Sequence, residues 1–359
     1  MPSATSVLDY RVLIDGGSLE ACLGGSICCS KLGPCETDYS TRMTVRPIDI
    51  RMGGYGPPQT GFSRALKRIG ERLQQRFGDQ IEVKYVWNIM DLGYRADDIL
   101  GLVESGILTL GYQSSSYLTD QVPELGFVDL PFLFDSNDHA RAAMDGPLGA
   151  FLAQKIEEQM NYRILGWFEN GFRHISNRLQ SVRRPSDLAG MRIRILPSDV
   201  HKRTFELLGA VPLRMDLTEA VAMIGAGTID AQENPLSNTV TYGVHKFHRF
   251  HTLTGHFYIS RPIFINRDQF ESWPEDLQAE MQAAVTDAVA FQRDAAVEEH
   301  ESARRAIEAA NGEIIALDAV HHRAFVDAVQ PLHAEALTTF GTTMFDHAAN
   351  ARQQSEAGG

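Results

Sequence analysis

The segment Asp187–Pro235 constrains the fold most, because its apolar pattern switches repeatedly between the period of a strand and that of a helix. In MRIRI, which begins at Met191, apolar residues alternate with arginines, so one face of the strand is apolar and the other carries two guanidinium groups. A helix capped by Asp199 follows, then a short strand, a second helix from Thr218, and a third strand that leads into the polar turn QENP. This order predicts an α/β fold.

The same order of elements occurs earlier in the chain. Strands are expected over Ile48–Met52, Ile81–Trp87 and Ile107–Tyr112, with helices over Gly61–Phe77 and from Asp97 to Ser105 between them. This order predicts a parallel sheet with right-handed crossovers. Ligands of such sheets bind at the carboxyl ends of the strands. We therefore expect Tyr55, Trp87 and the turn at residues 113–116 to line a cleft.

Length and charge limit the possible functions. A chain of 359 residues is long enough for two domains, since single cores rarely grow past about 250 to 300 residues. The formal charge of −13 argues against nonspecific binding to nucleic acid or to acidic membrane surfaces. It does not argue against binding a small anion, because the local field of the site decides that. No stretch approaches the ~18 apolar residues that span a bilayer, so direct membrane insertion is not expected.

The first 42 residues are expected to be an N-terminal extension without order of its own. All four cysteines lie there, with a spacing that matches neither a zinc ribbon nor a CxxC redox pair: Cys22, Cys28, Cys29 and Cys35. A disulfide and inert thiols both remain open. A secretory signal has a basic start, an apolar run and a small-residue cleavage site. The segment from Met1 to Met43 shows none of these, which leaves a wrong gene start or a cytoplasmic protein as alternatives.

Several spaced motifs resemble one protein family. They are ENGFRHISNR, ELGFVDLPFLF, DLAGMRIRILPS, FELLGAVPLRM, GTIDAQENP and LTGHFYISRPIFINRDQFESWPEDLQ. Together they are similar to the extracytoplasmic solute-binding subunit of tripartite ATP-independent periplasmic (TRAP) transporters, of the C4-dicarboxylate-binding, DctP-like type, over roughly Val45 to Gly341. The resemblance implies a two-lobed, periplasmic-binding-protein-like α/β fold with a ligand cleft between the lobes and a long helix that spans both.

The resemblance also implies which residues hold the ligand. Arg194 stands at the position of the arginine that clamps the ligand carboxylate, and Arg173 matches a second arginine that often assists it. A guanidinium fork suits this role, because it binds a carboxylate through two parallel charge-assisted hydrogen bonds. Asn234 matches a ligand-contacting asparagine, and its amide can donate to a carboxylate and accept from a hydroxyl. The alternatives are a solvated strand arginine and an Asx turn.

Two further residues are weaker candidates for ligand binding. Glu169 could bind an amine or hydroxyl of the ligand or hold Arg173 in place, and surface exposure fits the sequence equally well. His256 begins a strand that is expected to return to the first lobe. The HxxHxxH run from His245 favours a partly exposed helix over a metal site, because the residue at i+6 faces away from the first. We therefore predict no metal ligands.

The expected function is that of a solute-binding protein. Its two lobes close around a small organic carboxylate, and the membrane subunits of a TRAP transporter recognise the closed state. The expected division is an extension at 1–42, lobe I from 43–168 and 255–293, lobe II from 169–254 and 294–347, and a flexible tail at 348–359. The resemblance implies a periplasmic location, whereas the missing signal leaves a cytoplasmic one open.

The alternative is a cytoplasmic enzyme or ligand sensor built on the same fold, since a fold does not fix function. The acid–base candidates for such an enzyme are Glu169, His174 and His256. The sequence has no G-x-S-x-G elbow, H-E-x-x-H, phosphate loop or dinucleotide fingerprint. We therefore predict no catalytic residue and no cofactor, and whether the protein is an enzyme stays open.

Deleting residues 1–42 is expected to leave the melting temperature of the remaining chain within a few degrees, because the segment shows no core periodicity. Thermal unfolding of the full-length and shortened proteins, followed by circular dichroism, measures the difference. A loss of soluble expression on deletion would show that the extension is part of the fold.

Overall fold

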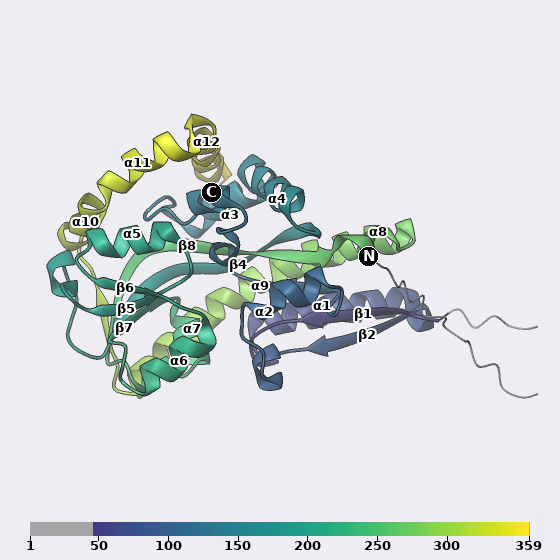
Figure 1. Cartoon of the computed structure of the whole chain (residues 1–359), viewed down its shortest axis with the longest axis horizontal. Helices are drawn as coiled ribbons and strands as arrows, with labels where there is room; N and C mark the ends of the chain where they lie inside the picture. Colours follow the sequence, from purple (N-terminus) through teal and green to yellow (C-terminus); the bar gives the residue numbers. More distant parts are fainter. Residues whose placement is uncertain (1–45, 359) are drawn as a thin grey trace, which may run out of the picture. The chain divides into compact units, whose positions relative to one another are not determined.

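One nine-stranded sheet organises residues 46–358, the part of the chain that the computed structural model describes (Figure 1). Its strands are β1 (Ile48–Gly53), β2 (Ile81–Val86), β3 (Leu110–Tyr112), β4 (Tyr162–Asn177), β5 (Arg192–Ile195), β6 (Val211–Arg214), β7 (Ala231–Asn234), β8 (Phe250–Asn266) and β9 (Glu313–Ala316). Their order is β2-β1-β3-β8-β4-β7-β5-β6, and β9 pairs with β8. The expectations for residues 1–42 lie outside the described residues.

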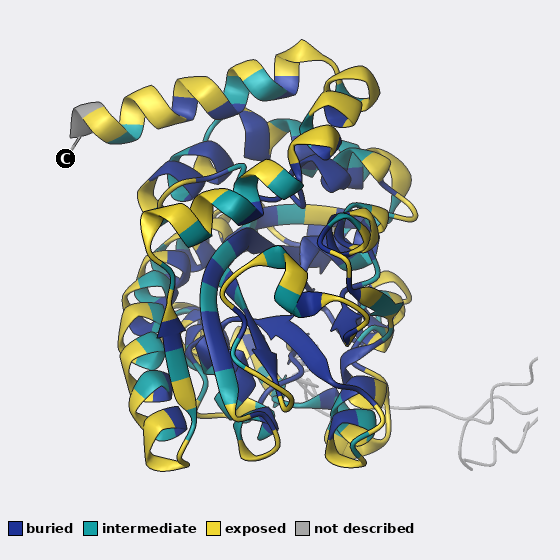
Figure 2. Ribbon diagram, turned by 90° about the vertical axis from the view of Figure 1, so that its left-hand side faces the viewer, coloured by how far each residue is buried: buried dark blue, intermediate teal, exposed yellow. Residues whose placement is uncertain are grey.

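Helices surround the sheet. They are α1 (Gly61–Phe77), α2 (Asp98–Glu104), α3 (Asn137–Asp145), α4 (Pro147–Gln159), α5 (Asp199–Leu207), α6 (Leu217–Gly225), α7 (Leu236–Thr241), α8 (Arg267–Glu271), α9 (Glu275–Ala309), α10 (Ala319–Ala328), α11 (Gln330–Phe340) and α12 (Thr342–Gly358). Figure 2 shows the strands as the most buried part and the exposed residues on the outer faces of the helices.

Two groups of parallel strands form the outer parts of the sheet, as the sequence predicts. In the first group β1 pairs with β2 and β3, and in the second β5 pairs with β6 and β7. The helix α1, which connects β1 with β2, has an ordinary cap at each end. At its start the Thr60 side chain accepts a hydrogen bond from the Ser63 backbone N–H. It ends at Gly78, which has a φ of 53°. Its apolar positions are buried in the core: Phe62, Leu66, Ile69 and Leu73.

The strands β4 and β8 join the two groups. They pair antiparallel along almost their whole length of 16 and 17 residues (Figure 1). The strand β4 continues past Phe168 through a polar segment to Asn177. The register of the pairing shifts at three places, near Leu165, near Gly171 and opposite Gly255. The φ values of Gly171 and Gly255 are 83° and 56°, a region that favours glycine. The connection between the two groups is therefore a long ribbon with three local breaks, two of them at glycines.

The predicted long helix is α9, which is 35 residues long. It packs against α1 in the first group and α7 in the second, and it follows β4 between them. Its apolar face is formed by Leu277, Met281, Val285 and Val289, all buried. This helix and the β4–β8 ribbon therefore both cross between the two groups.

The buried apolar residues of the described chain fall into one large cluster, a smaller one and two of three residues each. The large cluster surrounds β1–β3, and the smaller one surrounds β5 and α5. The sequence places all the C-terminal helices with the second lobe, but α11 and α12 join the large cluster through Leu332, Ala336 and Met344, and only α10 packs in the smaller one, through Phe325. The expected flexible tail is helical as far as Gly358, and Ala348 and Ala351 are buried. The exact lobe boundaries stay a prediction.

The HxxHxxH run does not form the helix that the sequence favours. A short 3-10 helix at Val244–Lys246 is followed by three residues and then by β8, and His248 and His251 are buried at 1% and 0% exposure. The Nδ1 of His248 hydrogen-bonds with the Ser176 hydroxyl at 2.9 Å, and Nε2 of His251 donates to the His248 carbonyl at 3.0 Å. Local hydrogen bonds therefore stabilise these rings inside the second group.

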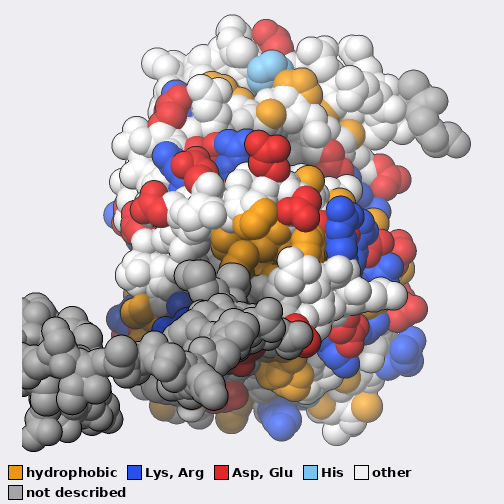
Figure 3. All heavy atoms as spheres, turned by 90° about the vertical axis from the view of Figure 1, so that its right-hand side faces the viewer, with side chains coloured by type: hydrophobic (Ala, Val, Ile, Leu, Met, Phe, Trp, Pro, Cys, Tyr) orange, Lys and Arg blue, Asp and Glu red, His pale blue; other side chains and the backbone are white. Residues whose placement is uncertain are grey.

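The surface carries charges of both signs. Figure 3 shows one face of the molecule, on which Lys and Arg side chains lie among Asp and Glu side chains rather than apart from them. Several of these charges form ion pairs, such as Arg68 with Asp287 at 2.5 Å. Among the helices that the structure describes, none has the length and apolar character needed to cross a membrane.

Buried histidines predict that stability falls at mildly acidic pH. Burial is the main cause that lowers the pKa of His174 and His248 to about 3 and that of His251 to about 4, from an ordinary value of 6.5. Between these values the unfolded chain binds more protons than the folded one, so the free energy of unfolding decreases as pH falls from about 6.5 to 4. We expect unfolding at pH 5 to take up about three protons at these residues.

Calorimetric unfolding at a series of pH values measures this proton uptake. The three histidine side chains must charge when the chain unfolds, whereas most carboxyl groups are ionised in both states at pH 5. A melting temperature that stays constant between pH 7 and pH 5 contradicts the prediction.

Candidate functional site

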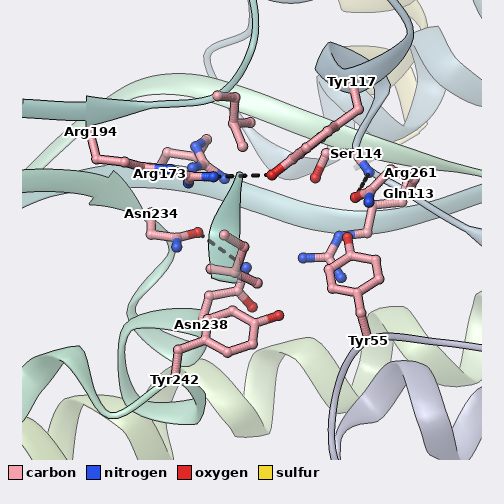
Figure 4. Close-up of a pocket in the computed structure, with 12 residues that line it drawn as sticks. Tyr55, Gln113, Ser114, Tyr117, Arg173, Arg194, Asn234, Asn238, Tyr242 and Arg261 are labelled. Carbon is pink, nitrogen blue, oxygen red and sulfur yellow. Dashed lines mark hydrogen bonds between the residues drawn. The ribbon is translucent and has the colours of Figure 1, made fainter. Parts of the chain in front are cut away.

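Side chains from both strand groups and from the β4–β8 ribbon enclose a small pocket (Figure 4). The lining residues are Tyr55, Gln113, Ser114, Tyr117, Arg173, Arg194, Leu196, Leu217, Asn234, Asn238, Tyr242 and Arg261. The cavity between them measures about 20 Å³. Typical ligand pockets measure about 300 to 1,000 Å³, so in this arrangement the walls lie almost in contact. Three arginines and a set of neutral hydrogen-bonding groups make the lining strongly polar.

Arg194 lies in β5, on the strand face opposite Ile193 and Ile195, as its alternation predicts. The residue is 1% exposed. Its Nε and Nη2 donate to the Met215 carbonyl at 3.1 and 3.0 Å, and Nη2 also donates to the Tyr117 hydroxyl at 3.1 Å (Figure 4). Arg194 forms no ion pair with any acidic residue between positions 46 and 358. A buried guanidinium is therefore held by neutral acceptors alone.

Arg173, in contrast, already has a carboxylate partner. Its Nε and Nη2 bind the two carboxylate oxygens of Glu233, the second at 2.9 Å, and Nη2 also donates to the Glu233 carbonyl at 2.7 Å. Both side chains are fully buried, at 1% and 0% exposure. The pairing arises because β4 and β7 are neighbours and place Ile175 opposite Glu233. The charge of Arg173 is therefore balanced within the protein.

His256 lies behind this ion pair. Its Nε2 is 3.8 Å from the Glu233 carboxylate, and its Nδ1 is 2.6 Å from the Thr254 hydroxyl. Burial is the main cause that lowers the pKa of His256 well below its ordinary value, and neighbouring His174 and Arg173 lower it further. The imidazole is therefore neutral, and its contact with Glu233 is not an ion pair.

A chain of amides connects the pocket with the ribbon. Asn238 Nδ2 donates to the side-chain oxygen of Asn234 at 3.1 Å (Figure 4). It also donates to the side-chain oxygen of Asn170 at 3.0 Å. The same Asn170 oxygen accepts a 2.7 Å hydrogen bond from Nη2 of Arg261. Asn234 therefore has its oxygen occupied, and its amide nitrogen is the group that remains to bind a ligand.

Tyrosine hydroxyls supply further donors. Burial is the main cause that raises the pKa of Tyr55 and of Tyr117 above the ordinary value. Burial also raises the pKa of Tyr242, to about 12. These phenols stay protonated at neutral pH, so each can donate a hydrogen bond to an anion but cannot act as its counter-charge.

The structure places four of the seven expected ligand residues in this pocket: Tyr55, Arg173, Arg194 and Asn234. Trp87 lies outside the lining, with its ring stacked on Tyr85 at a centroid distance of 4.4 Å. His256 lies behind the ion pair described above, and Glu169 lines a different cavity. The two arginines that the family resemblance predicts as ligand-binding residues, Arg173 and Arg194, thus line the same pocket.

Sequence reasoning missed Arg261 and Glu233. Arg261 interrupts the apolar run of β8, which is a signal that a buried charge is needed there. The sequence predicts a polar turn at Glu233, but residues 231–234 form β7, which holds the Glu233 side chain against Arg173. Only the pairing of β4 with β7 reveals that contact.

A second, larger cavity of about 680 Å³ lies along the β4–β8 ribbon, between α9 and α10. Its lining is mainly apolar, with Phe132, Phe134 and Phe172, and it contains neither Lys nor Arg. Glu169 borders it, but Arg141 binds the Glu169 carboxylate at 2.6 and 3.0 Å and the Tyr258 hydroxyl donates to it at 2.9 Å. The smaller pocket is therefore the candidate site, because it holds the unpaired cations.

Within residues 46–358 no group of three or more His, Cys, Asp or Glu side chains could hold a metal ion. The donors of the candidate site are guanidinium, amide and phenol groups, which bind anions rather than metals.

Replacing Glu233 by glutamine is expected to lower the free energy of unfolding by about 3 kcal/mol, because Arg173 then stays buried without its counter-charge. Denaturant unfolding of the variant and the wild type measures the change. Glu313→Gln, at an exposed position of β9, is the control and should have little effect. Replacing both partners with methionine should recover part of the loss, since no buried charge remains. A stable single variant contradicts the prediction.

Comparison with known proteins agrees with this fold. A family model described as bacterial extracellular solute-binding protein, family 7 (DctP), matches residues 52–339. A solute-binding protein of Verminephrobacter eiseniae is 31% identical over 289 residues, which cover 80% of this chain and 84% of that protein.

Solved structures share the architecture. The sugar acid binding protein of Advenella mimigardefordensis in complex with galactonate matches with a TM-score of 0.81 at 25% identity, over 86% of this chain and 99% of that one. A TRAP periplasmic solute-binding protein of Shewanella oneidensis with bound succinate matches in fold with a TM-score of 0.80 at 21% identity, over 85% and 99% of the two chains. The chain belongs to family 7 of the bacterial extracellular solute-binding proteins, the DctP family of TRAP solute-binding proteins.

Proposed function

We propose that the candidate site captures a small organic carboxylate and that Arg194 binds the carboxylate group. One observation carries this proposal: Arg194 is buried, it faces the pocket, and its described hydrogen-bond partners are neutral. Burying a charge without a counter-charge is costly. A carboxylate supplies that counter-charge and accepts two parallel hydrogen bonds from the guanidinium fork.

The neighbouring groups complete the carboxylate site. The Tyr117 hydroxyl is positioned by its hydrogen bond with Arg194, and the Asn234 amide nitrogen is directed by the contact between Asn234 and Asn238. The Arg173–Glu233 pair borders the same space with its charge already balanced. Arg173 therefore contributes hydrogen bonds and shape, and Arg194 contributes the net charge.

Binding requires the pocket to open. A cavity of about 20 Å³ holds roughly one water molecule, which is smaller than any organic acid. Two of the three breaks in the β4–β8 ribbon, those at Gly171 and Gly255, lie between the two strand groups. We infer that the ribbon bends there, so that the lobes separate to admit the ligand and close around it.

The family sets the context for this binding. Its members are described as extracellular, and two of the solved relatives are named as binders of organic acids. We infer that this chain works outside the cytoplasm and delivers its ligand to the membrane subunits of a TRAP transporter. The ligands of those relatives differ in their number of carboxylates, since galactonate has one and succinate has two.

Replacing Arg194 by lysine is expected to weaken ligand binding at least roughly tenfold, about 1.4 kcal/mol, because lysine keeps the charge but loses the two-pronged geometry. Arg194→Ala should cost on the order of 2–5 kcal/mol. Thermal-shift screening of small carboxylates identifies a ligand, and calorimetric titration then measures the dissociation constants.

Arg192→Lys is the matched control, because Arg192 lies two residues before Arg194 on the same strand face but is exposed and pairs with Asp230 at 2.9 Å. It should bind the ligand as tightly as the wild type. Equal binding by the wild type and Arg194→Ala would show that another group holds the carboxylate.

A further inference from the structure

The larger cavity along the β4–β8 ribbon has a lining whose chemistry the carboxylate site does not use. Strands β4 and β8 form one side of it, and helices α9 and α10 form the other. Its volume of about 680 Å³ lies within the usual range of small-molecule sites. The described residues that line it and those that line the smaller pocket have no member in common. A molecule bound here therefore occupies a separate site.

Aromatic rings form much of the apolar wall of this cavity. Phe132, Phe134 and Phe172 line it together with Leu253. Phe132 has a φ of 55°, a value that bulky residues rarely adopt, and its backbone N–H donates to the His256 carbonyl at 2.8 Å. Phenylalanine rings suit a flat apolar body, and their faces also attract a cation. The wall therefore favours an aromatic ligand that is neutral or positively charged.

The charges of the lining are negative. Among the described residues that line it are three carboxylates and neither Lys nor Arg. Asp135 is paired with Arg352 at 2.7 Å. Glu169 is paired with Arg141, as described above. Glu301 is exposed, and it forms no ion pair and no side-chain hydrogen bond with any other described residue. The lining therefore disfavours an anion and offers one carboxylate to a cation.

Two N–H groups add hydrogen-bond donors to the lining. Burial is the main cause that lowers the pKa of His174 to about 3, so its ring is neutral. Its Nδ1 accepts a 3.1 Å hydrogen bond from the Gly255 backbone N–H, which leaves the ring proton on Nε2. Asn170 is 7% exposed, and its Nδ2 is buried without a hydrogen-bond partner among the described groups. Both donors can be satisfied by a neutral oxygen of a ligand.

We propose that this cavity is a second ligand site, which binds a small aromatic amine with a neutral oxygen at its far end. The ring packs among the phenylalanines, the oxygen accepts a hydrogen bond from His174 or Asn170, and the ammonium group lies beside Glu301. The proposal does not depend on carboxylate binding by Arg194, since that residue lines the other pocket.

Three matched compounds test the class of ligand. Tyramine carries both polar ends, tyrosol has a hydroxyl in place of the ammonium group, and phenethylamine lacks the phenol oxygen. Calorimetric titration at about pH 8 keeps an ordinary alkylamine protonated and an ordinary imidazole neutral. The wild type should bind tyramine at least roughly fivefold more tightly than either of the other two compounds, because each of them loses one polar contact.

Replacing Glu301 by glutamine tests the contact with the ammonium group. The variant should bind tyramine at least roughly threefold more weakly and tyrosol within about twofold of the wild type, since only the amine uses the charge. Glu298→Gln is the matched control, because Glu298 is an exposed carboxylate of the same helix outside the lining. It should bind all three compounds as the wild type does.

A bulky side chain at the cavity tests the location. Val297 lines the cavity and is 57% exposed, so Val297→Trp can fill the space without disturbing the core. This variant should weaken the binding of tyramine at least roughly tenfold. Val320→Trp is the control, because Val320 is 78% exposed on α10 and lies outside the lining.

The outcomes decide the proposal. A preference for tyramine that narrows in Glu301→Gln and binding that is lost in Val297→Trp, with both controls unchanged, support it. A wild type that binds none of the compounds, or that binds tyrosol as tightly as tyramine, overturns it. Tyramine binding that Val297→Trp leaves intact also overturns it, because the amine then binds elsewhere. Equal losses in Glu301→Gln and Glu298→Gln overturn the role of Glu301, because general surface charge then explains the attraction.

Discussion

The antiparallel pairing of β4 with β8 is the interaction on which the rest of the structure depends. These two strands are the only described strands that connect the β1–β3 group with the β5–β7 group within the sheet. They also carry Arg173 and Arg261 into the pocket and Gly171 and Gly255 at the breaks between the groups. One ribbon thus forms a wall of the pocket and the connection between the two groups.

Charge balance explains which side chains surround the three arginines of the pocket. Three arginines converge in a water-poor space, and mutual repulsion would be costly if none were compensated. Glu233 compensates Arg173, and aromatic faces and neutral acceptors hold the other two. The described chain therefore folds around a pocket in which one of three arginines has a carboxylate partner. That arrangement favours an anionic ligand over a neutral one of the same shape.

The larger cavity along the ribbon shows why volume alone is a poor guide to a binding site. It has more than enough space for a small acid, yet its lining contains neither Lys nor Arg, and its Glu169 carboxylate is already bound by Arg141. The small pocket has little space in this arrangement but is lined by three buried arginines. The chemistry of the lining, and not the volume, therefore identifies the candidate site.

The sequence by itself determined the two parallel groups, the long helix and the positions of Arg194 and Asn234 near the strand ends. Apolar residues that repeat every two residues predict a strand, and those that repeat every 3.6 residues predict a helix. These patterns lie within one segment of the sequence, so they predict its structure without information about the segments that pack against it. The family resemblance then placed Arg173 beside Arg194, which periodicity could not do, because they lie on different strands.

Only the tertiary structure decided the partner of Arg173, the burial of His256, the place of Glu169 and the participation of Arg261. Each depends on which strand lies beside which: β7 beside β4 brings Glu233 to Arg173, and β8 brings Arg261 over Phe62. It also decided that residues 348–358 are helical, since Ala348 and Ala351 pack where α12 meets α3. Such contacts join segments that are far apart in the chain, so they cannot be predicted from local sequence patterns.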